Sequence, residues 1–218
     1  MNTRVLTPQQ LVAEISSRLQ APSSTSSSRL QDPSSKQSSR RPEDRLDGVV
    51  ELLYKQRRYF WIGIYVVAGD RLVQQSFRGP KPLWHAFTAG QANVGTVWQS
   101  GKMKVVPDIS KDQNYCKFFG EVKSEIIVPI KRAGRVVGVI DVESDRSNAF
   151  AYADQVLLRR VAMQLARFFT ADGRLLLRKL REAVSNHRVT EAANQQKLQP
   201  ASERPEPARR AAGAAPRA

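Results

Sequence analysis

The segment from residue 123 to residue 143, KSEIIVPIKRAGRVVGVIDVE, constrains the fold more than any other part of the chain. Two runs rich in β-branched residues, 125–131 and 135–143, flank the short turn Arg132-Ala133-Gly134. Two such runs around a glycine-containing turn predict a β-hairpin. Both arms are apolar over most of their length, which predicts a central pair of strands rather than the edge of a sheet.

The predicted hairpin carries carboxylates at one end. Glu125 begins the first arm, and Asp141 and Glu143 end the second. These two ends lie side by side in an antiparallel pair, so the hairpin gathers three acidic groups. They are either solvated strand ends or a site for a small ligand that is cationic or donates hydrogen bonds. Spacing alone leaves both interpretations open.

The rest of the chain supplies further strands and helices around this hairpin. Helices first, a run of about six strands and a closing helix predict an α+β domain, in which helices pack on one face of an antiparallel sheet. Periodicity predicts helices at 7–20, 43–57, 94–99 and 152–170, and strands at 59–67, 71–77, 84–87 and 102–106.

Composition divides the chain into five parts. Residues 1–20 are an N-terminal helix, and residues 21–42, with nine serines, are a flexible linker because they bury too little apolar surface to offset their ordering entropy. The main domain spans 43–171. A C-terminal helix is predicted at 172–186 and a disordered basic tail at 187–218.

Charge and cysteine usage limit the partners and the compartment that we expect. The net charge is +15, and residues 173–218 alone carry ten basic and four acidic side chains, which predicts weak, non-specific contact of the tail with anions or nucleic acid. No recognition motif accompanies this charge. With one cysteine and no apolar run of membrane-spanning length, we expect a cytoplasmic protein without membrane contact.

Catalytic residues are few. Cys116 is the single thiol, and nucleophilic catalysis would require a depressed pKa and a nearby base, whereas a lone loop cysteine is more often incidental. The two histidines, His85 and His187, lie in the main domain and in the tail, so neither a metal site nor a triad is expected. The sequence predicts no metal and no cofactor.

Three alternating residues lie on the first predicted strand of the main domain. Trp61, Gly63 and Tyr65 lie on one face of a predicted strand, because side chains alternate along a strand. That face is either part of the hydrophobic core or the aromatic wall of a ligand pocket.

The order of motifs resembles that of a GAF domain over residues 44–170, and within that superfamily it resembles the free methionine-R-sulfoxide reductases. The motifs are WIGIY at 61–65, VPDIS at 106–110, SEIIVPI at 124–130 and GVIDVES at 138–144. The resemblance implies a six-stranded antiparallel sheet, with helices behind it and a small closed pocket on the other side.

The resemblance also implies a ligand site. In that family, carboxylates bind the ammonium group of a free amino acid and aromatic residues surround its side chain. The matching positions are Glu125, Asp141 and Glu143 for the carboxylates, with Trp61 and Tyr65 for the aromatic wall.

The family cysteines are replaced in this chain. Their positions correspond to Trp84, Val94 and Phe118, although Cys116 lies only two positions from the last. No second thiol exists to resolve a sulfenic acid, so turnover would need an external thiol.

Three functions follow as hypotheses. The first is a GAF-type sensor or pseudoenzyme that binds an amino-acid-like or cationic metabolite. The second is a reductase that uses Cys116 and an external reductant. The third is an interaction module acting through its basic tail, with the pocket filled by Trp84 and Phe118. We also expect a homodimer formed through the terminal helices. The identity of the ligand is left open.

Overall fold

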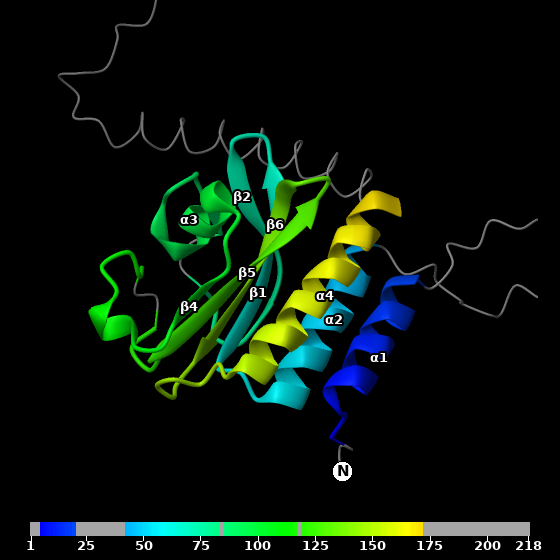
Figure 1. Ribbon diagram of the computed structural model, residues 1–218, viewed down its shortest axis with the longest axis horizontal. Coiled ribbons are helices and arrows are strands. Elements are labelled where there is room, and N and C mark those ends of the chain that lie inside the picture. The colour runs from blue at the N-terminus through cyan, green and yellow to red at the C-terminus, as the bar shows by residue number, and fades with distance from the viewer. Residues whose placement is uncertain (1–4, 21–41, 83–84, 117–118, 172–218) are drawn as a thin grey trace, which may run out of the picture. The chain divides into compact units, whose positions relative to one another are not determined.

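The computed structural model of the protein describes residues 5–20, 42–82, 85–116 and 119–171 (Figure 1). Within these ranges, six strands form one antiparallel sheet in the order β3-β2-β1-β6-β5-β4. The strands are β1 (Trp61–Ala68), β2 (Arg71–Arg78), β3 (Ala86–Phe87), β4 (Lys104–Val106), β5 (Ser124–Arg132) and β6 (Arg135–Ser144). The helices are α1 (Pro8–Gln20), α2 (Pro42–Arg57), α3 (Ala92–Ser100) and α4 (Tyr152–Ala171), with a short 3-10 turn at Ile109–Lys111. The predicted α+β fold is confirmed.

The predicted hairpin is β5–β6, and it is central, because β6 lies between β1 and β5 and β4 continues the sheet beyond β5. Its turn is shorter than the sequence suggested. Arg132 pairs with Arg135, so only Ala133 and Gly134 lie outside the strands, with φ angles of 46° and 76°. Two central residues with positive φ are typical of the tight turns that match the twist of a hairpin.

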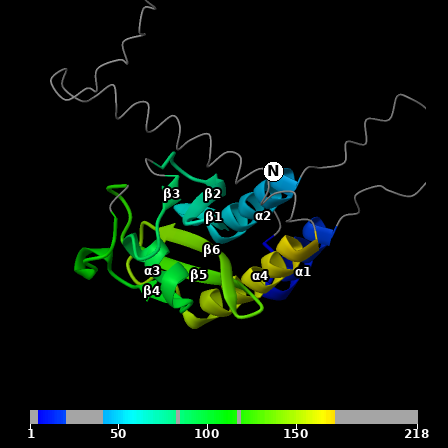
Figure 2. The same cartoon turned by 90° about the horizontal axis from the view of Figure 1, so that it is seen from above.

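Helices cover both faces of the sheet. The long helices α2 and α4 lie side by side on one face, and α3 packs on the other, against β5 and β6 (Figures 1 and 2). Between the sheet and the two long helices lies an apolar layer that contains Leu46, Val49, Val50, Leu53, Ile62, Ile64, Ile126, Ile140, Val142, Leu157, Leu158, Val161 and Leu165. This layer leaves the opposite face of the sheet free to carry polar residues.

The N-terminal helix α1 packs on α2 and α4. A capping box begins this helix, because the Gln10 amide donates to Thr7 Oγ1 at 3.3 Å and the Thr7 amide donates to Gln10 Oε1 at 3.0 Å. The apolar face of α1, with Leu11, Ile15 and Leu19, is buried within the chain. The homodimer through the terminal helices stays a prediction.

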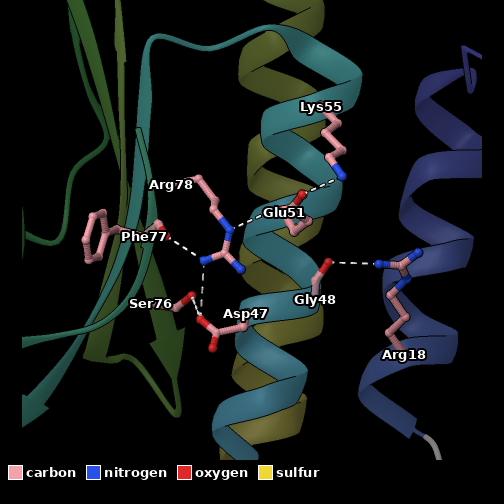
Figure 3. A network of polar contacts seen from close by, with 8 residues as sticks. All are labelled: Arg18, Asp47, Gly48, Glu51, Lys55, Ser76, Phe77 and Arg78. Atoms are coloured by element: carbon pink, nitrogen blue, oxygen red, sulfur yellow. Dashed lines mark hydrogen bonds and ion pairs between the residues drawn. The ribbon is translucent and has the colours of Figure 1, made fainter. Parts of the chain in front are cut away.

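A polar network connects α2 with β2 and α1 (Figure 3). Arg78 on β2 donates to Glu51 on α2, and it also donates to the Phe77 carbonyl at 2.7 Å. On the other side of α2, Arg18 of α1 donates to the Gly48 carbonyl at 2.9 Å. These contacts connect two elements, β2 and α1, to α2, so this helix is fixed by charge-assisted hydrogen bonds as well as by apolar packing.

Several predictions fall outside the described residues. These are residues 21–41 of the linker predicted at 21–42, the helix and tail at 172–218, and the two aromatic residues Trp84 and Phe118, which were expected to fill the pocket in the third hypothesis. Among the helices that are described, none has the length and hydropathy required to cross a membrane.

Candidate functional site

The register of the central strands brings the three predicted acids together on the face that carries α3. Glu125 on β5 lies directly opposite Glu143 on β6, and Asp141 lies two residues before Glu143 on the same face. One carboxylate oxygen from each residue lies within 4.8 Å of the other two. The strand ends are therefore not solvated. Solvated strand ends were one of the two interpretations that the sequence allowed.

The neighbouring strand β1 adds the two predicted aromatic residues. Trp61 lies opposite Glu143, and Tyr65 lies four pairs further along, opposite Val139. Between them, Gly63 lies opposite Asp141. A Cβ on Gly63 would be only 2.2 Å from Trp61 Cη2, so the indole ring lies directly over the glycine. The glycine is required there for the indole to lie flat along the strand.

The aromatic wall continues into the core. The rings of Trp61 and Phe77 stack with centroids 6.3 Å apart, and Tyr65 meets Phe87 edge to face at 5.6 Å. The same apolar cluster contains Val94, at the position where the resemblance places a family cysteine. Trp61 and Tyr65 are thus core residues that lie beside the acids, and their role as the wall of a ligand pocket stays a prediction.

Burial dominates the electrostatics of the site. Glu125, Asp141 and Glu143 are 3%, 3% and 2% exposed. Loss of solvation disfavours their charged forms, and the acids also repel one another. Burial accordingly raises the pKa of Glu125 to about 7 and that of Glu143 to about 8. The pKa of Asp141 is raised well above its ordinary value by burial first and by the charges of the two glutamates second.

One of the acids belongs to a hydrogen-bond chain that sequence reasoning missed. Asn93, at the start of α3, donates from Nδ2 to Glu125 Oε2 at 2.7 Å. Lys104 on β4 donates to Asn93 Oδ1 at 2.6 Å and forms an ion pair with Asp112, also at 2.6 Å. The sequence signal that could have found Lys104 was the alternation of β4, which puts Lys104 and Val106 on the same face of the sheet as Glu125. Nothing in the sequence pointed to Asn93.

Three buried polar atoms in and beside the cluster have no hydrogen-bond partner among the described residues. They are Asp141 Oδ1, Glu143 Oε2 and Trp61 Nε1. The other oxygen of Glu143 accepts a hydrogen bond of 3.3 Å from the Tyr115 hydroxyl. Buried polar groups are almost always paired with protein groups or ordered water, so these buried acceptors call for a donor that the described residues do not supply.

The single thiol lies within electrostatic reach of the acids. Cys116 is partly exposed, and burial raises the pKa of its thiol, with a further increase from the charge of Glu125. Both effects oppose formation of the thiolate, which is the nucleophilic form. The described surroundings therefore disfavour the thiolate of Cys116.

The arrangement suits a small cation that donates hydrogen bonds. An ammonium group with three N–H···O contacts of ordinary length holds its acceptors about 4.6 Å apart. A hard metal ion such as Ca²⁺ also takes carboxylate oxygens at comparable separations, so the three acids are the residues that could hold a metal. The aromatic residues beside them favour an organic cation.

Comparison with known proteins agrees with this geometry. Residues 41–168 match the model of the GAF domain family. The chain is 34% identical over 117 residues to GAF domain-containing protein A of Dictyostelium discoideum, covering 53% of this chain and 73% of that protein. It is 31% identical over 106 residues to the free methionine-R-sulfoxide reductase of Saccharomyces cerevisiae, covering 47% of this chain and 58% of that protein.

A solved structure shows the same fold. The free methionine-R-sulfoxide reductase of Neisseria meningitidis, in complex with its substrate, aligns with a TM-score of 0.66 and 22% identity over 80% of this chain and 95% of that chain. The resemblance seen in the sequence is confirmed, and the chain belongs to the GAF domain family.

Proposed function

We propose that this GAF domain binds a small molecule bearing an ammonium group, of the amino-acid type, and acts as a sensor or pseudoenzyme. The observation that carries the proposal is the enclosed cluster of Glu125, Asp141 and Glu143, two of which have an unpaired buried oxygen. An uncompensated carboxylate cluster is costly to bury, and a bound cation would remove that cost.

The described cation that acts on Glu125 does not fill this role. Lys104 reaches the cluster through Asn93, and its ammonium group pairs with Asp112 instead. The described residues thus leave a place for an external positive charge. An ammonium group would donate to the three carboxylates, and the aromatic side chains of Trp61 and Tyr65 would contact the apolar part of the ligand.

The relatives support an amino acid as the ligand class. The proteins from Saccharomyces cerevisiae and Neisseria meningitidis are named as reductases of free methionine-R-sulfoxide. Amino-acid binding would be shared with them, while the replacement of a family cysteine by the buried Val94 favours binding without reduction.

The direct test is calorimetric titration with L-methionine and L-methionine sulfoxide, with the analogues that lack the amino group as matched controls. We expect binding of the amino acids alone, and loss of most of the affinity in Glu125→Gln. Glu121→Gln is the control variant, because Glu121 is exposed and lies outside the cluster. Equal binding of the deaminated analogues, or a site occupied by Ca²⁺ alone, would contradict the proposal.

A second candidate is a one-cysteine reductase, favoured by one observation. The charge of Glu125 raises the pKa of the Cys116 thiol, so the two groups interact electrostatically. In that reaction the cysteine sulfur would attack the sulfoxide sulfur, giving a thioether and a sulfenic acid that an external dithiol reduces back to the thiol with release of water. Loss of methionine sulfoxide in the presence of dithiothreitol, abolished in Cys116→Ser, would establish it. Equal rates in wild type and variant would exclude it.

A further inference from the structure

A cavity lies apart from the carboxylate cluster. It is an open groove of about 390 Å³, between the segment that follows α3, the outer edge of β5 and helix α4. The short strand β4 pairs with β5 only as far as Ile127, so β5 residues 128–132 have no strand partner on this side within the described residues. No acidic residue is among those that line the groove.

The walls of the groove are mostly apolar. Met163 of α4 is 56% exposed, an unusual position for a large apolar side chain on a folded domain. The other apolar residues of the lining are Met103, Val128, Pro129 and Ala162. A volume near 400 Å³ with an apolar lining falls within the range of small-molecule sites.

Two cations complete the lining, Lys131 of β5 and Arg159 of α4. Neither has an ion pair or hydrogen bond in the described part of the chain. The Lys131 ammonium group lies close to Gly101, where α3 ends, and the partial negative charge of that helix end offsets part of its charge. Arg159 has no such compensation. The groove therefore combines an apolar surface with positive charge that lacks a counterion.

We propose that this groove is a binding site for a small organic anion that has an apolar body and one acidic group. The apolar body would lie along Met103 and Met163, and the acidic group would face Arg159 and Lys131. This site is independent of the carboxylate cluster, which takes a ligand of opposite charge. Nothing in the proposal depends on the function proposed for that cluster.

Other occupants fit less well. A peptide added as a strand beside β5 would meet Pro129, which has no amide hydrogen to donate. The chain's own residues 173–218 carry ten basic and four acidic side chains, so they have the same sign of charge as the groove. A second copy of this face would bring the same cations. Charge complementarity thus selects an anion from outside the chain.

The probe that tests this is 1-anilinonaphthalene-8-sulfonate, with the uncharged N-phenyl-1-naphthylamine as a matched control. Methyl-labelled methionine reports where the probe binds, because the chain has three methionines and two of them line the groove. We expect the Met103 and Met163 methyl signals, assigned with leucine variants, to shift together and saturate with the sulfonate. The absence of saturable shifts at both methyls would overturn the proposal.

Two neighbouring arginines provide the charge test. Arg159 lines the groove, whereas Arg160 is exposed on the same helix and is not part of the lining. Arg159→Gln is expected to weaken sulfonate binding about threefold, as for the loss of one exposed charge pair, while Arg160→Gln leaves it unchanged. Binding of the uncharged probe should be equal in all three proteins. An equal loss in both variants, or equal affinity for the two probes, would show that the groove does not select an anion.

Discussion

Glu125 on β5 and Glu143 on β6 face each other directly across the central hairpin, and both are almost fully buried. Like charges directly opposite in an antiparallel pair destabilise a sheet, and burial removes the solvent that would screen them. The pair therefore retains protons near neutral pH, with pKa values raised to about 7 and about 8. The pairing that places these residues therefore destabilises the folded protein as the carboxyl groups ionise.

The pH dependence of stability follows from these values. Because the folded-state pKa of each glutamate lies above its unfolded value near 4.3, the folded state binds more protons between about pH 4.5 and 8. The free energy of unfolding should fall as pH rises through this window, by about 1.4 kcal/mol per pH unit for each retained proton. Urea unfolding at pH 5, 6, 7 and 8 measures this slope.

The Glu143→Gln variant isolates the contribution of one site. Glutamine cannot ionise, so the slope between pH 5 and 8 should become shallower, and the variant should gain stability relative to wild type at pH 8. Glu121→Gln removes an exposed charge and should leave the slope unchanged. A slope that is the same in all three proteins would mean that Glu143 ionises in the folded protein as it does in water.

Gly63→Ala tests the contact between the glycine and Trp61. The added Cβ would be 2.2 Å from the indole, so the ring must move. We expect a loss of about 1–3 kcal/mol in the free energy of unfolding, together with a change in tryptophan fluorescence. Gly120→Ala is the control, because a Cβ there meets nothing within 4 Å. Wild-type stability and fluorescence in Gly63→Ala would refute this packing.

Asn93→Ala tests the hydrogen bond that supports Glu125. Removing the amide takes away a donor to the carboxylate and an acceptor for Lys104. The cost expected at pH 7 is about 1–3 kcal/mol, the penalty of leaving buried polar groups unpaired. The hydrogen bond also lowers the pKa of Glu125, so its loss should raise this pKa and move the fall in the free energy of unfolding to higher pH. Asn114→Ala, at an exposed position, should change neither property in the same urea titrations.

The sequence predicted the parts of the site that depend on strand periodicity. Alternation placed Trp61, Gly63 and Tyr65 on one face, and the hairpin placed Glu125 beside Glu143. Both follow from the two-residue period of a strand and from a short turn, which are local properties. The direct pairing of Trp61 with Glu143 depends on β1 lying next to β6. No local signal gives that strand order, and the GAF resemblance implied only that these residues share one site.

The parts that the sequence could not predict depend on contacts between distant elements. Asn93 reaches Glu125 only because α3 crosses β5 on one face of the sheet, and a polar residue in the first turn of a helix gives no sign of such a partner. The groove beside Arg159 arises because β4 is shorter than the predicted strand at 102–106, which leaves part of β5 unpaired. Strand length at a sheet edge is set by tertiary contacts that periodicity does not report.

The reactivity of Cys116 distinguishes a binding domain from a one-cysteine enzyme. Burial raises the pKa of the thiol, and the charge of Glu125 raises it further. Alkylation by iodoacetamide should therefore be slow at pH 7. The pH at which its rate reaches half of the maximum, the midpoint, should lie above that of a free cysteine in a model peptide. In Glu125→Gln the midpoint should fall toward the peptide value because one of the two causes is removed, whereas Glu121→Gln should leave it in place. A midpoint below that of the peptide in wild type would show an activated thiolate and would favour the reductase over the binding domain.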